Sequence, residues 1–281
     1  DAIISTHFYT AFILSKKIKI PLYTVITDYY PKVHKIWLAP RVNKFFVATP
    51  QIKQILDKEG FNSFVAGIPI HPNFYLPKNN NKIKEKWGLD TAFPTVLFMP
   101  TIKGKINIEK TIKMLLAEFK KIKCIDPVFT RSLGKANEFA FHSLTSQINL
   151  IVIIGKKNQV LLTKILQIKN RAVNIQNLLF LQQTSQIDEL MSIADAIITK
   201  AGGLTLSECL CLQKPIIIIN PIPGQEEHNA NYFVRQGWAT QAKNNQDLII
   251  KIKETLTNNV SNSNTLLQTN ASGTILKCVL N

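Results

Sequence analysis

Short apolar segments alternate with amphipathic ones along most of the chain. The apolar segments are rich in Ile, Val, Leu and Phe and are bounded by Gly, Pro or polar residues, which predicts buried strands. Strands are expected at 2–5, 22–26, 44–48, 64–66, 95–99, 150–154, 178–181, immediately before Gly202, and at 215–219 and 239–242. Helices are expected between them, including 8–17, 50–58, 108–121, one that follows the turn at Gly155 and extends to about residue 169, 187–193 and 246–257. Strands that alternate with helices indicate βαβ units and parallel sheets, so the predicted fold class is α/β.

A change in composition marks a boundary within the chain. The segment Asn79–Asn81 and several lysines around it separate two apolar regions, and Pro94 precedes a new strand. A polar segment followed by proline between two apolar regions is typical of a domain boundary. We therefore expect one domain at 1–93 and a second at 94–281. Residues 258–275 are rich in Asn, Ser and Thr, and we expect them to be poorly ordered.

Composition excludes several classes of protein. Hydrophobic residues make up 46% of the 281 residues, which is enough for a substantial core and argues against disorder. The net charge is +16, which attracts nucleic acid or anionic lipid head groups, but no block of five or more like charges occurs. Basic and aromatic residues are not interleaved, so nucleic acid is not expected as a partner. The four cysteines lack ligand spacing, which argues against a disulfide framework or a cysteine metal site.

Two polar turns follow successive predicted strands in the second half of the chain. Gly202 and Gly203 follow the first of these strands and open a helix, where free amides can bind phosphate. The segment Gly224–Asn229 follows the second strand and is rich in amides and carboxylates. In a parallel sheet both turns lie at the carboxyl ends of strands, where α/β proteins bind ligands. The pattern therefore predicts a nucleotide site.

Each of these polar turns also has a purely structural interpretation. Thr205–Glu208 fits the S/T-x-x-E capping box, so Glu208 either caps a helix or accepts hydrogen bonds from a sugar diol. The amides and carboxylates of Gly224–Asn229 suit hexose hydroxyls, which need both donors and acceptors, but they also suit a capped helix with a solvated acidic turn. His228 is expected to be an exposed helix residue rather than a catalytic base.

Several stretches in the same order resemble one protein family. They are 26–28 with 34–37, 46–49, 67–70, Gly155–Lys156 with Asn158, 188–191, 198–208 and 221–231. On these residues the chain resembles the processive diacylglycerol glucosyltransferases and the plant-type monogalactosyldiacylglycerol synthases, which are relatives of the lipid-II-forming N-acetylglucosaminyltransferase. The resemblance extends over nearly the whole chain to about residue 245 and rests mainly on the last two stretches.

The resemblance implies two Rossmann-like domains of the GT-B type, of which the N-terminal one is incomplete, so the chain is expected to be N-terminally truncated. The C-terminal domain would bind a UDP-sugar in the cleft between the domains. The implied donor site consists of Gly155 and Leu181 near the uracil, Gly202, Gly203 and Thr205 at the diphosphate, Glu208 at the ribose, and Gly224, Gln225, Glu226 and Asn229 at the hexose.

The resemblance also implies the reaction. A hexose from UDP-glucose or UDP-galactose would be transferred with inversion to diacylglycerol, without a metal or other cofactor. The family carries its acceptor-binding His in a glycine-rich N-terminal loop that this chain does not contain, so the catalytic base is expected in the missing portion. The basic charge and the apolar segment 8–14 suit peripheral binding to an anionic membrane surface, at the cytoplasmic face.

The chain departs from the family pattern at several places. A glycine-rich turn should follow the strand at 95–99, but the loop there contains Lys103 and Lys105, which would compensate for the missing glycines or leave donor binding weaker. Residues 124–147 look like an insertion or surface loop, and a glycine expected near Leu181 is missing. These departures keep an alternative open, which is a non-catalytic or degenerate homologue that binds nucleotide sugar or lipid. A UDP-sugar epimerase of the same fold fits the motifs less well.

Overall fold

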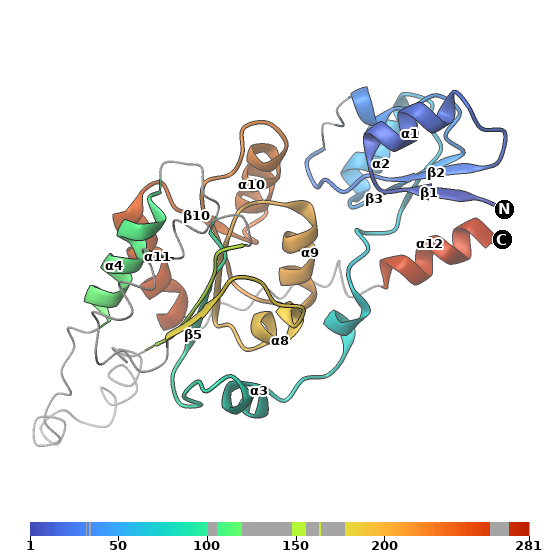
Figure 1. Cartoon of the computed structure of the whole chain (residues 1–281). Coiled ribbons are helices and arrows are strands. Elements are labelled where there is room, and N and C mark those ends of the chain that lie inside the picture. Colours follow the sequence, from blue (N-terminus) through green and yellow to red (C-terminus); the bar gives the residue numbers. More distant parts are fainter. Residues whose placement is uncertain are drawn as a thin grey trace, which may run out of the picture.

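The computed structural model describes residues 1–31, 33, 35–100, 106–119, 148–155, 163, 178–258 and 270–280. The described residues form two parallel β-sheets, each with helices packed against it (Figure 1). All the predicted strands are present, and wherever both ends were predicted they differ from the observed ends by at most one residue. The α/β fold class is therefore confirmed.

In the first sheet, each described strand is added on the same side of the one before it. It contains, in both spatial and sequence order, β1 (Ile3–Ser5), β2 (Leu22–Val25), β3 (Lys44–Val47) and β4 (Ser63–Val65). Its other elements are α1 (Phe8–Ser15), the 3₁₀ turn η1 (Lys35–Trp37) and α2 (Pro50–Lys58). The Thr49 hydroxyl accepts a hydrogen bond of 3.3 Å from the amide of Ile52, which caps α2 as the sequence predicted.

In the second sheet the order in which successive strands are added reverses in the middle of the sheet. Its spatial order is β10-β9-β8-β5-β6-β7, and every paired neighbour is parallel. The strands are β5 (Thr95–Phe98), β6 (Asn149–Ile153), β7 (Leu178–Leu181), β8 (Ala196–Thr199), β9 (Ile216–Ile218) and β10 (Thr240–Gln241). Read from β7, this is the doubly wound order of a Rossmann domain, with its switch point between β5 and β8. The first sheet shows no reversal among the described residues, so the N-terminal Rossmann-like domain is incomplete.

Helices cover both faces of the second sheet. They are α4 (Ile108–Glu118), α8 (Ile187–Ser192), α9 (Gly203–Cys211), α10 (Gln225–Arg235) and α11 (Asn245–Thr257), while η2 (Pro72–Tyr75) and α3 (Asn80–Lys86) lie in the connection between the sheets. Ile197 belongs to the core shared with α8, α9 and α10, and its neighbour Ile198 belongs to the core shared with α4 and α11. Burial on both faces explains why these strands are continuously apolar.

The last helix corrects one prediction. Of residues 258–275, which were expected to be poorly ordered, 259–269 lie outside the described residues, whereas 271–275 belong to the helix α12 (Ala271–Leu280). Its Ile275 is buried against Val25 and Phe46 of the first sheet, and Cys278 and Val279 of the same helix pack against this cluster. Figure 1 shows α12 next to the first sheet, near both chain ends. The division at residues 93 and 94 stays a prediction, and α12 lies with the first sheet although it is last in sequence.

Two expected features fall where the structure gives no description. The loop that contains Lys103 and Lys105 and the expected insertion at 124–147 both lie outside the described residues. The same holds for the helix expected after Gly155 as far as about residue 169, of which only residue 163 is described.

Candidate active site

The turn after β8 places a helix start at the switch point of the second sheet. Gly202 is the N-terminal cap of α9, with φ −73° and ψ 131°, and no side chain caps the helix. The first-turn amides of any helix have no partner within the helix, and here they point out at the carboxyl end of the strands. A β-carbon at Gly202 would meet no atom within 4 Å, so there is open space beside this turn.

The second glycine of the pair serves a different purpose. A β-carbon placed on Gly203 would collide with the carbonyl oxygen of Thr27 and would lie 3.4 Å from the Ile68 side chain. Both neighbours belong to the N-terminal half of the chain. Glycine at position 203 therefore allows α9 to approach the first domain closely, a role that the sequence did not predict.

Glu208 is not a capping residue. Because α9 begins at Gly203, Thr205 lies inside its first turn and Glu208 lies one turn further on, so the capping-box interpretation is wrong. The Glu208 side chain is partly buried, and this burial raises the pKa of its carboxyl group to about 7. Among the described residues, no hydrogen-bond or ion-pair partner satisfies this carboxylate. Such a group is available to a ligand that offers hydroxyl donors.

The turn after β9 is held by its own polar groups. Gly224 has φ 94° and ψ −115°, a conformation that requires glycine. The Glu226 carboxylate accepts a hydrogen bond of 3.0 Å from the Ile222 amide and forms an ion pair with Lys200, which precedes Gly202. This ion pair joins the two polar turns to each other.

Asn229 links the second turn to the first domain. Its side chain is fully buried, and its Oδ1 accepts hydrogen bonds from the amides of Tyr29 at 3.0 Å and Tyr30 at 3.3 Å. Its Nδ2 donates to Asp28 Oδ1 at 3.4 Å and to the carbonyl oxygen of Ala201 at 3.3 Å. An asparagine amide has two donors and two acceptor positions, so protein atoms use all four here.

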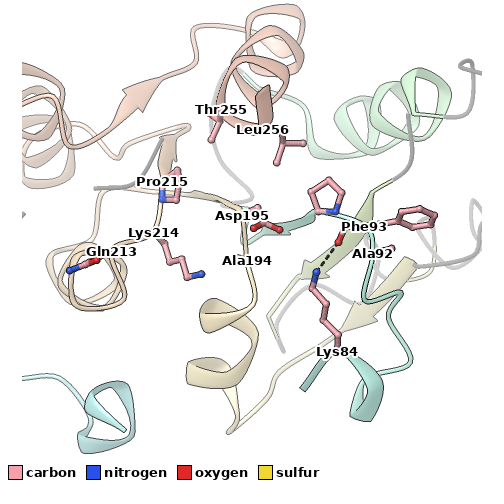
Figure 2. Close-up of a pocket in the computed structure, with 11 residues that line it drawn as sticks. Lys84, Ala92, Phe93, Ala194, Asp195, Gln213, Lys214, Pro215, Thr255 and Leu256 are labelled. Atoms are coloured by element: carbon pink, nitrogen blue, oxygen red, sulfur yellow. Dashed lines mark hydrogen bonds between the residues drawn. The ribbon is translucent and has the colours of Figure 1, made fainter. Parts of the chain in front are cut away.

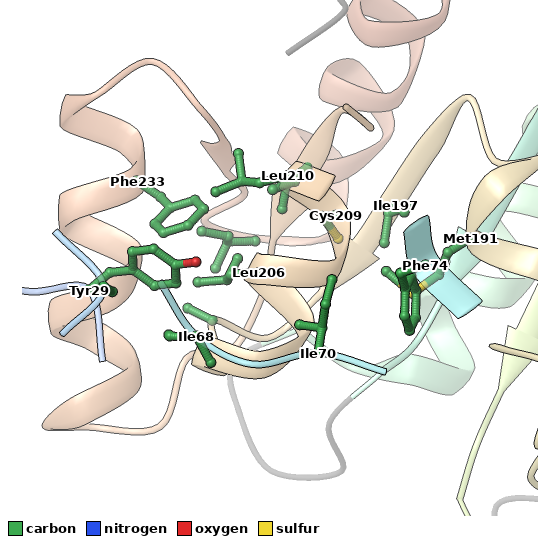
Figure 3. Close-up of a cluster of buried hydrophobic side chains, with 14 of the residues drawn as sticks. Tyr29, Ile68, Ile70, Phe74, Met191, Ile197, Leu206, Cys209, Leu210 and Phe233 are labelled. Atoms are coloured by element: carbon green, nitrogen blue, oxygen red, sulfur yellow. The ribbon is translucent and has the colours of Figure 1, made fainter. Parts of the chain in front are cut away.

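Tyr29 completes the contact between the domains. Its hydroxyl lies 2.7 Å from Ser207 Oγ on α9, and its ring meets that of Phe233 on α10 edge-on, with centroids 4.9 Å apart. Figure 3 shows the Tyr29 ring beside that of Phe233, with its hydroxyl directed toward α9. Sequence reasoning missed both Asp28 and Tyr29 as site residues, although a polar and aromatic segment directly after an apolar strand was the available signal.

A cavity of about 890 Å³ lies between the first domain and the start of α10. Most of its lining is apolar, and its polar side chains include Asp28, Lys35, Glu59 and Gln225. His228 also lines the cavity and stacks on Tyr30, with ring centroids 4.5 Å apart. As expected, His228 is exposed on its helix.

Gly155 and Leu181 lie together at the same edge of the second sheet as Gly202. Gly155 follows β6 with φ 82°, and its amide donates a hydrogen bond of 2.9 Å to the carbonyl oxygen of Gln182. The amide of Ile154 donates to the carbonyl oxygen of Leu181 at 3.0 Å. The predicted uracil contacts are thus adjacent, and their role stays a prediction.

A second cavity, of about 480 Å³, lies at the opposite edge of this sheet (Figure 2). Three of its lining residues, Pro94, Asp195 and Pro215, directly precede β5, β8 and β9. The Nζ atom of Lys84 donates a hydrogen bond of 2.8 Å to the carbonyl oxygen of Phe93 beside it. Because ligands of doubly wound sheets bind at the carboxyl ends of the strands, this cavity is not part of the predicted site.

A complete Rossmann sheet, faced by an incomplete one across a pair of polar turns, defines the GT-B type of α/β protein. The chain belongs to glycosyltransferase family 28. The model of the family's C-terminal domain matches residues 123–277, and the model of monogalactosyldiacylglycerol (MGDG) synthase matches residues 1–70. The family suggested by the sequence is thus confirmed.

Curated relatives share this resemblance along most of the chain. A processive diacylglycerol beta-glucosyltransferase of Bacillus cytotoxicus is 31% identical over 240 residues, which are 84% of this chain and 54% of the relative. The protein of the same description from Bacillus cereus strain G9842 is 32% identical over 246 residues, which are 86% of this chain and 55% of the relative. The chain therefore spans about half the length of the curated relatives it matches.

Solved structures share the fold. The crystal structure of Acinetobacter baumannii MurG aligns with a TM-score of 0.58 and 15% identity, covering 100% of this chain and 73% of that one. The structure of S. aureus MnaA with UDP aligns with a TM-score of 0.63 and 12% identity, covering 99% and 74%. At such low identity these structures establish the two-domain fold alone.

Proposed function

We propose that this protein takes part in glycolipid synthesis by transferring a hexose from UDP-glucose or UDP-galactose to diacylglycerol. The observation that carries the proposal is Glu208, a partly buried carboxylate without a partner among the described residues, located one turn beyond the free amides of α9. A nucleoside diphosphate offers the complementary groups, since it has a ribose diol and a diphosphate anion.

The donor would lie along the carboxyl edge of the second sheet. Its diphosphate would receive hydrogen bonds at the start of α9, from the turn of Gly202, Gly203 and Thr205, and its ribose hydroxyls would donate to Glu208. Preorganised amides at this position stabilise the negative charge that develops on the leaving UDP. The uracil would lie near Gly155 and Leu181, which the structure already places side by side.

The hexose would lie at the start of α10, near Gly224, Gln225 and Glu226. Of these, Gln225 is exposed and lines the cavity of about 890 Å³, so its amide can reach a sugar hydroxyl. Asn229 uses all its hydrogen-bonding groups on protein atoms, and it would therefore support this end of the site through Asp28 and Tyr29 rather than contact the sugar.

The acceptor would enter the same cavity from the first domain. Its apolar lining, which includes Phe8, Val33 and Trp37, suits the hydrocarbon part of diacylglycerol. Three apolar side chains on α1 are exposed, namely Tyr9 at 59%, Phe12 at 40% and Ile13 at 43%, and Lys16–Lys19 adds three exposed lysines. This combination suits peripheral contact with the anionic cytoplasmic face of a membrane. In the part of the chain that the structure describes, no helix is both long and apolar enough to cross a bilayer.

The proposed chemistry is a single displacement. A base removes the proton from the acceptor hydroxyl, the oxygen attacks the anomeric carbon of the hexose, and the bond from that carbon to the phosphate oxygen breaks with inversion. The proposal uses no metal ion, because the helix-start amides supply the stabilisation of the leaving group.

Titration of UDP into wild type and Glu208→Ala tests the donor site. We expect the variant to lose roughly tenfold or more in affinity, because hydrogen bonds to charged groups contribute about 1.5–3 kcal/mol, and to keep its unfolding midpoint. Glu254→Ala, which removes an exposed carboxylate on α11, serves as the control and should bind UDP normally. Equal affinity of wild type and Glu208→Ala, or no UDP binding by either, would overturn the donor site. UDP binding without hexose transfer to diacylglycerol vesicles would favour a non-catalytic homologue.

A further inference from the structure

The cavity of about 480 Å³ lies at the amino edge of the second sheet, away from the proposed donor site (Figure 2). Pockets for small molecules occupy roughly 300–1,000 Å³, so this volume suits a small molecule better than a single ion. Its wall comes from three parts of the chain, which are the connection between the sheets, the segments before β5, β8 and β9, and the end of α11. None of the residues assigned above to the donor or the acceptor lines it.

Lys84 of α3 brings a buried positive charge to this cavity. The residue is only 9% exposed, and its Nζ atom donates hydrogen bonds to the carbonyl oxygens of Phe93 at 2.8 Å and Thr91 at 3.4 Å. An ammonium group has three donors, so one donor remains after these two bonds. Among the described residues, no carboxylate forms an ion pair with Lys84. Because a buried charge is costly unless it is paired, an anion in the cavity would stabilise this side chain.

Lys214 reaches the same cavity from the turn between α9 and β9. Gln213, directly before it, has φ 54°, a conformation in which glycine is usual after a helix, and its amide donates a hydrogen bond of 3.0 Å to the carbonyl oxygen of Leu210. Burial lowers the pKa of Lys214, the Asp195 carboxylate opposes this shift, and the positive charge of Lys84 adds to it. The two ammonium groups therefore influence each other across the cavity.

Two further polar groups in the wall narrow the class of ligand. Asp195 Oδ2 accepts a hydrogen bond of 2.7 Å from the amide of Thr95, which uses one of the roughly four acceptor positions of the carboxylate. Thr255 of α11 is 9% exposed, and its hydroxyl has no hydrogen-bond partner among the described residues. Two lysines and one carboxylate leave the wall with an excess of positive charge. The cavity therefore suits an anion that also offers a hydroxyl donor to Asp195.

We propose that this cavity binds a soluble phosphate monoester that carries a hydroxyl group. The phosphate accepts hydrogen bonds from Lys84, Lys214 and the Thr255 hydroxyl, since its three acceptor oxygens match these three donors. The hydroxyl group of the ligand donates to Asp195. A soluble ligand fits better than a lipid, because no large apolar side chain of the wall is exposed. The ligand joins the connection between the sheets to the second sheet, so its binding stabilises the folded protein.

Calorimetric titration of glycerol 3-phosphate into the whole chain, with and without saturating UDP, tests the site. We expect wild type to bind in both conditions and to unfold at a higher temperature when the ligand is present. Lys84→Gln and Lys214→Gln should each bind about tenfold more weakly, because each variant loses a charge-assisted hydrogen bond. Lys82→Gln removes an exposed lysine of the same helix α3 and is the matched control, which should bind within about twofold of wild type because solvent screens its charge.

Lys84 also supports the turn at 91–93, so Lys214→Gln decides the test if Lys84→Gln unfolds at a lower temperature than wild type. No binding by wild type, or equal affinity of Lys214→Gln and wild type, would overturn the proposal. Displacement of glycerol 3-phosphate by UDP would assign it to the donor site and would also overturn the proposal. Equal affinity of wild type for inorganic phosphate and glycerol 3-phosphate would overturn the contact between Asp195 and the hydroxyl group.

Discussion

The turn after β8 and the turn after β9 both lie at the start of a helix, but they use their polar groups differently. Each places glycine and polar side chains at the start of a helix. Beyond the first turn, the Glu208 carboxylate has no partner among the described residues. In the second turn, Glu226 is bonded to Lys200 and to the Ile222 amide, and Asn229 is bonded to both domains. Polar residues at a strand end can therefore be available to a ligand or can join two domains. Only their hydrogen-bond partners in the folded protein distinguish these two roles.

The largest effect is expected from Asn229→Ala, which removes the main polar link of the second turn. The substitution leaves the buried amide of Tyr29 and the partly buried amide of Tyr30 without an acceptor, and each unsatisfied buried donor costs about 1–3 kcal/mol. We expect the free energy of unfolding to fall by about 4 kcal/mol, measured by denaturant titration. Asn231→Ala, on the exposed side of the same helix, should change it by less than about 0.5 kcal/mol. Equal stability of the two variants would show that the second turn is not structural.

The next largest effect is expected to distinguish the two glycines of the first turn by the stability of their alanine variants. Gly203→Ala introduces a β-carbon that collides with the carbonyl oxygen of Thr27, so we expect a loss of about 2 kcal/mol in the free energy of unfolding. Gly202→Ala is the matched control, because its β-carbon meets nothing within 4 Å and its φ suits any residue. Stability should therefore hardly change in Gly202→Ala. Similar losses in both variants would contradict the assignment of only one glycine to the domain contact.

The smallest effect is the pH dependence of UDP binding through Glu208. Burial raises its pKa to about 7, and the ribose hydroxyls would bind best to the ionised form. UDP affinity should therefore rise through pH 7, by roughly tenfold between pH 6 and pH 8.5, because about a tenth of the group is ionised at pH 6. Glu208→Gln should remove most of this rise, as measured by calorimetric titration. A rise of the same size in the variant would assign the titration to another group.

The same raised pKa makes the free energy of unfolding depend on pH in the direction opposite to the UDP affinity. The ionised Glu208 is disfavoured by burial in the folded protein, so its protonated form contributes stability below the ordinary pKa of 4.5, and this contribution is lost as the pH rises toward 7. Free protein should therefore become less stable over this range, while UDP should bind more tightly. The two opposite trends are both expected of one carboxyl group that has no partner among the described residues and that the proposed ligand would supply with hydroxyl donors.

Local patterns predicted most of the fold. Strand ends were accurate because burial on both faces makes each strand of a parallel sheet apolar, and Gly or Pro marks its ends. The cap of α2 was also predicted, since Thr49 and Pro50 act within one turn of the helix. The helix α12 was missed because its sequence contains Ser, Gly and Thr, and its order comes from Ile275 packing against the first sheet.

The candidate site was predicted less completely than the fold. The residues of the two turns were found because their chemistry is visible over a few positions. Asp28 was missed as a site residue because its significance comes from Gln225 and Asn229, which are about 200 positions away along the chain. The capping interpretation of Glu208 failed because the helix begins at Gly203, three residues earlier than the motif suggests.

The sequence by itself determined the order of the elements, the glycines at the two turns and the family to which the chain belongs, because these depend on periodicity and on short motifs. Only the tertiary structure decided which polar groups are free. The contact of Gly203 with Thr27 and the four hydrogen bonds of Asn229 depend on how the two domains meet, and the absence of a partner for Glu208 among the described residues depends on how α9 packs. Such contacts join distant parts of the chain, and no local pattern of residues records them.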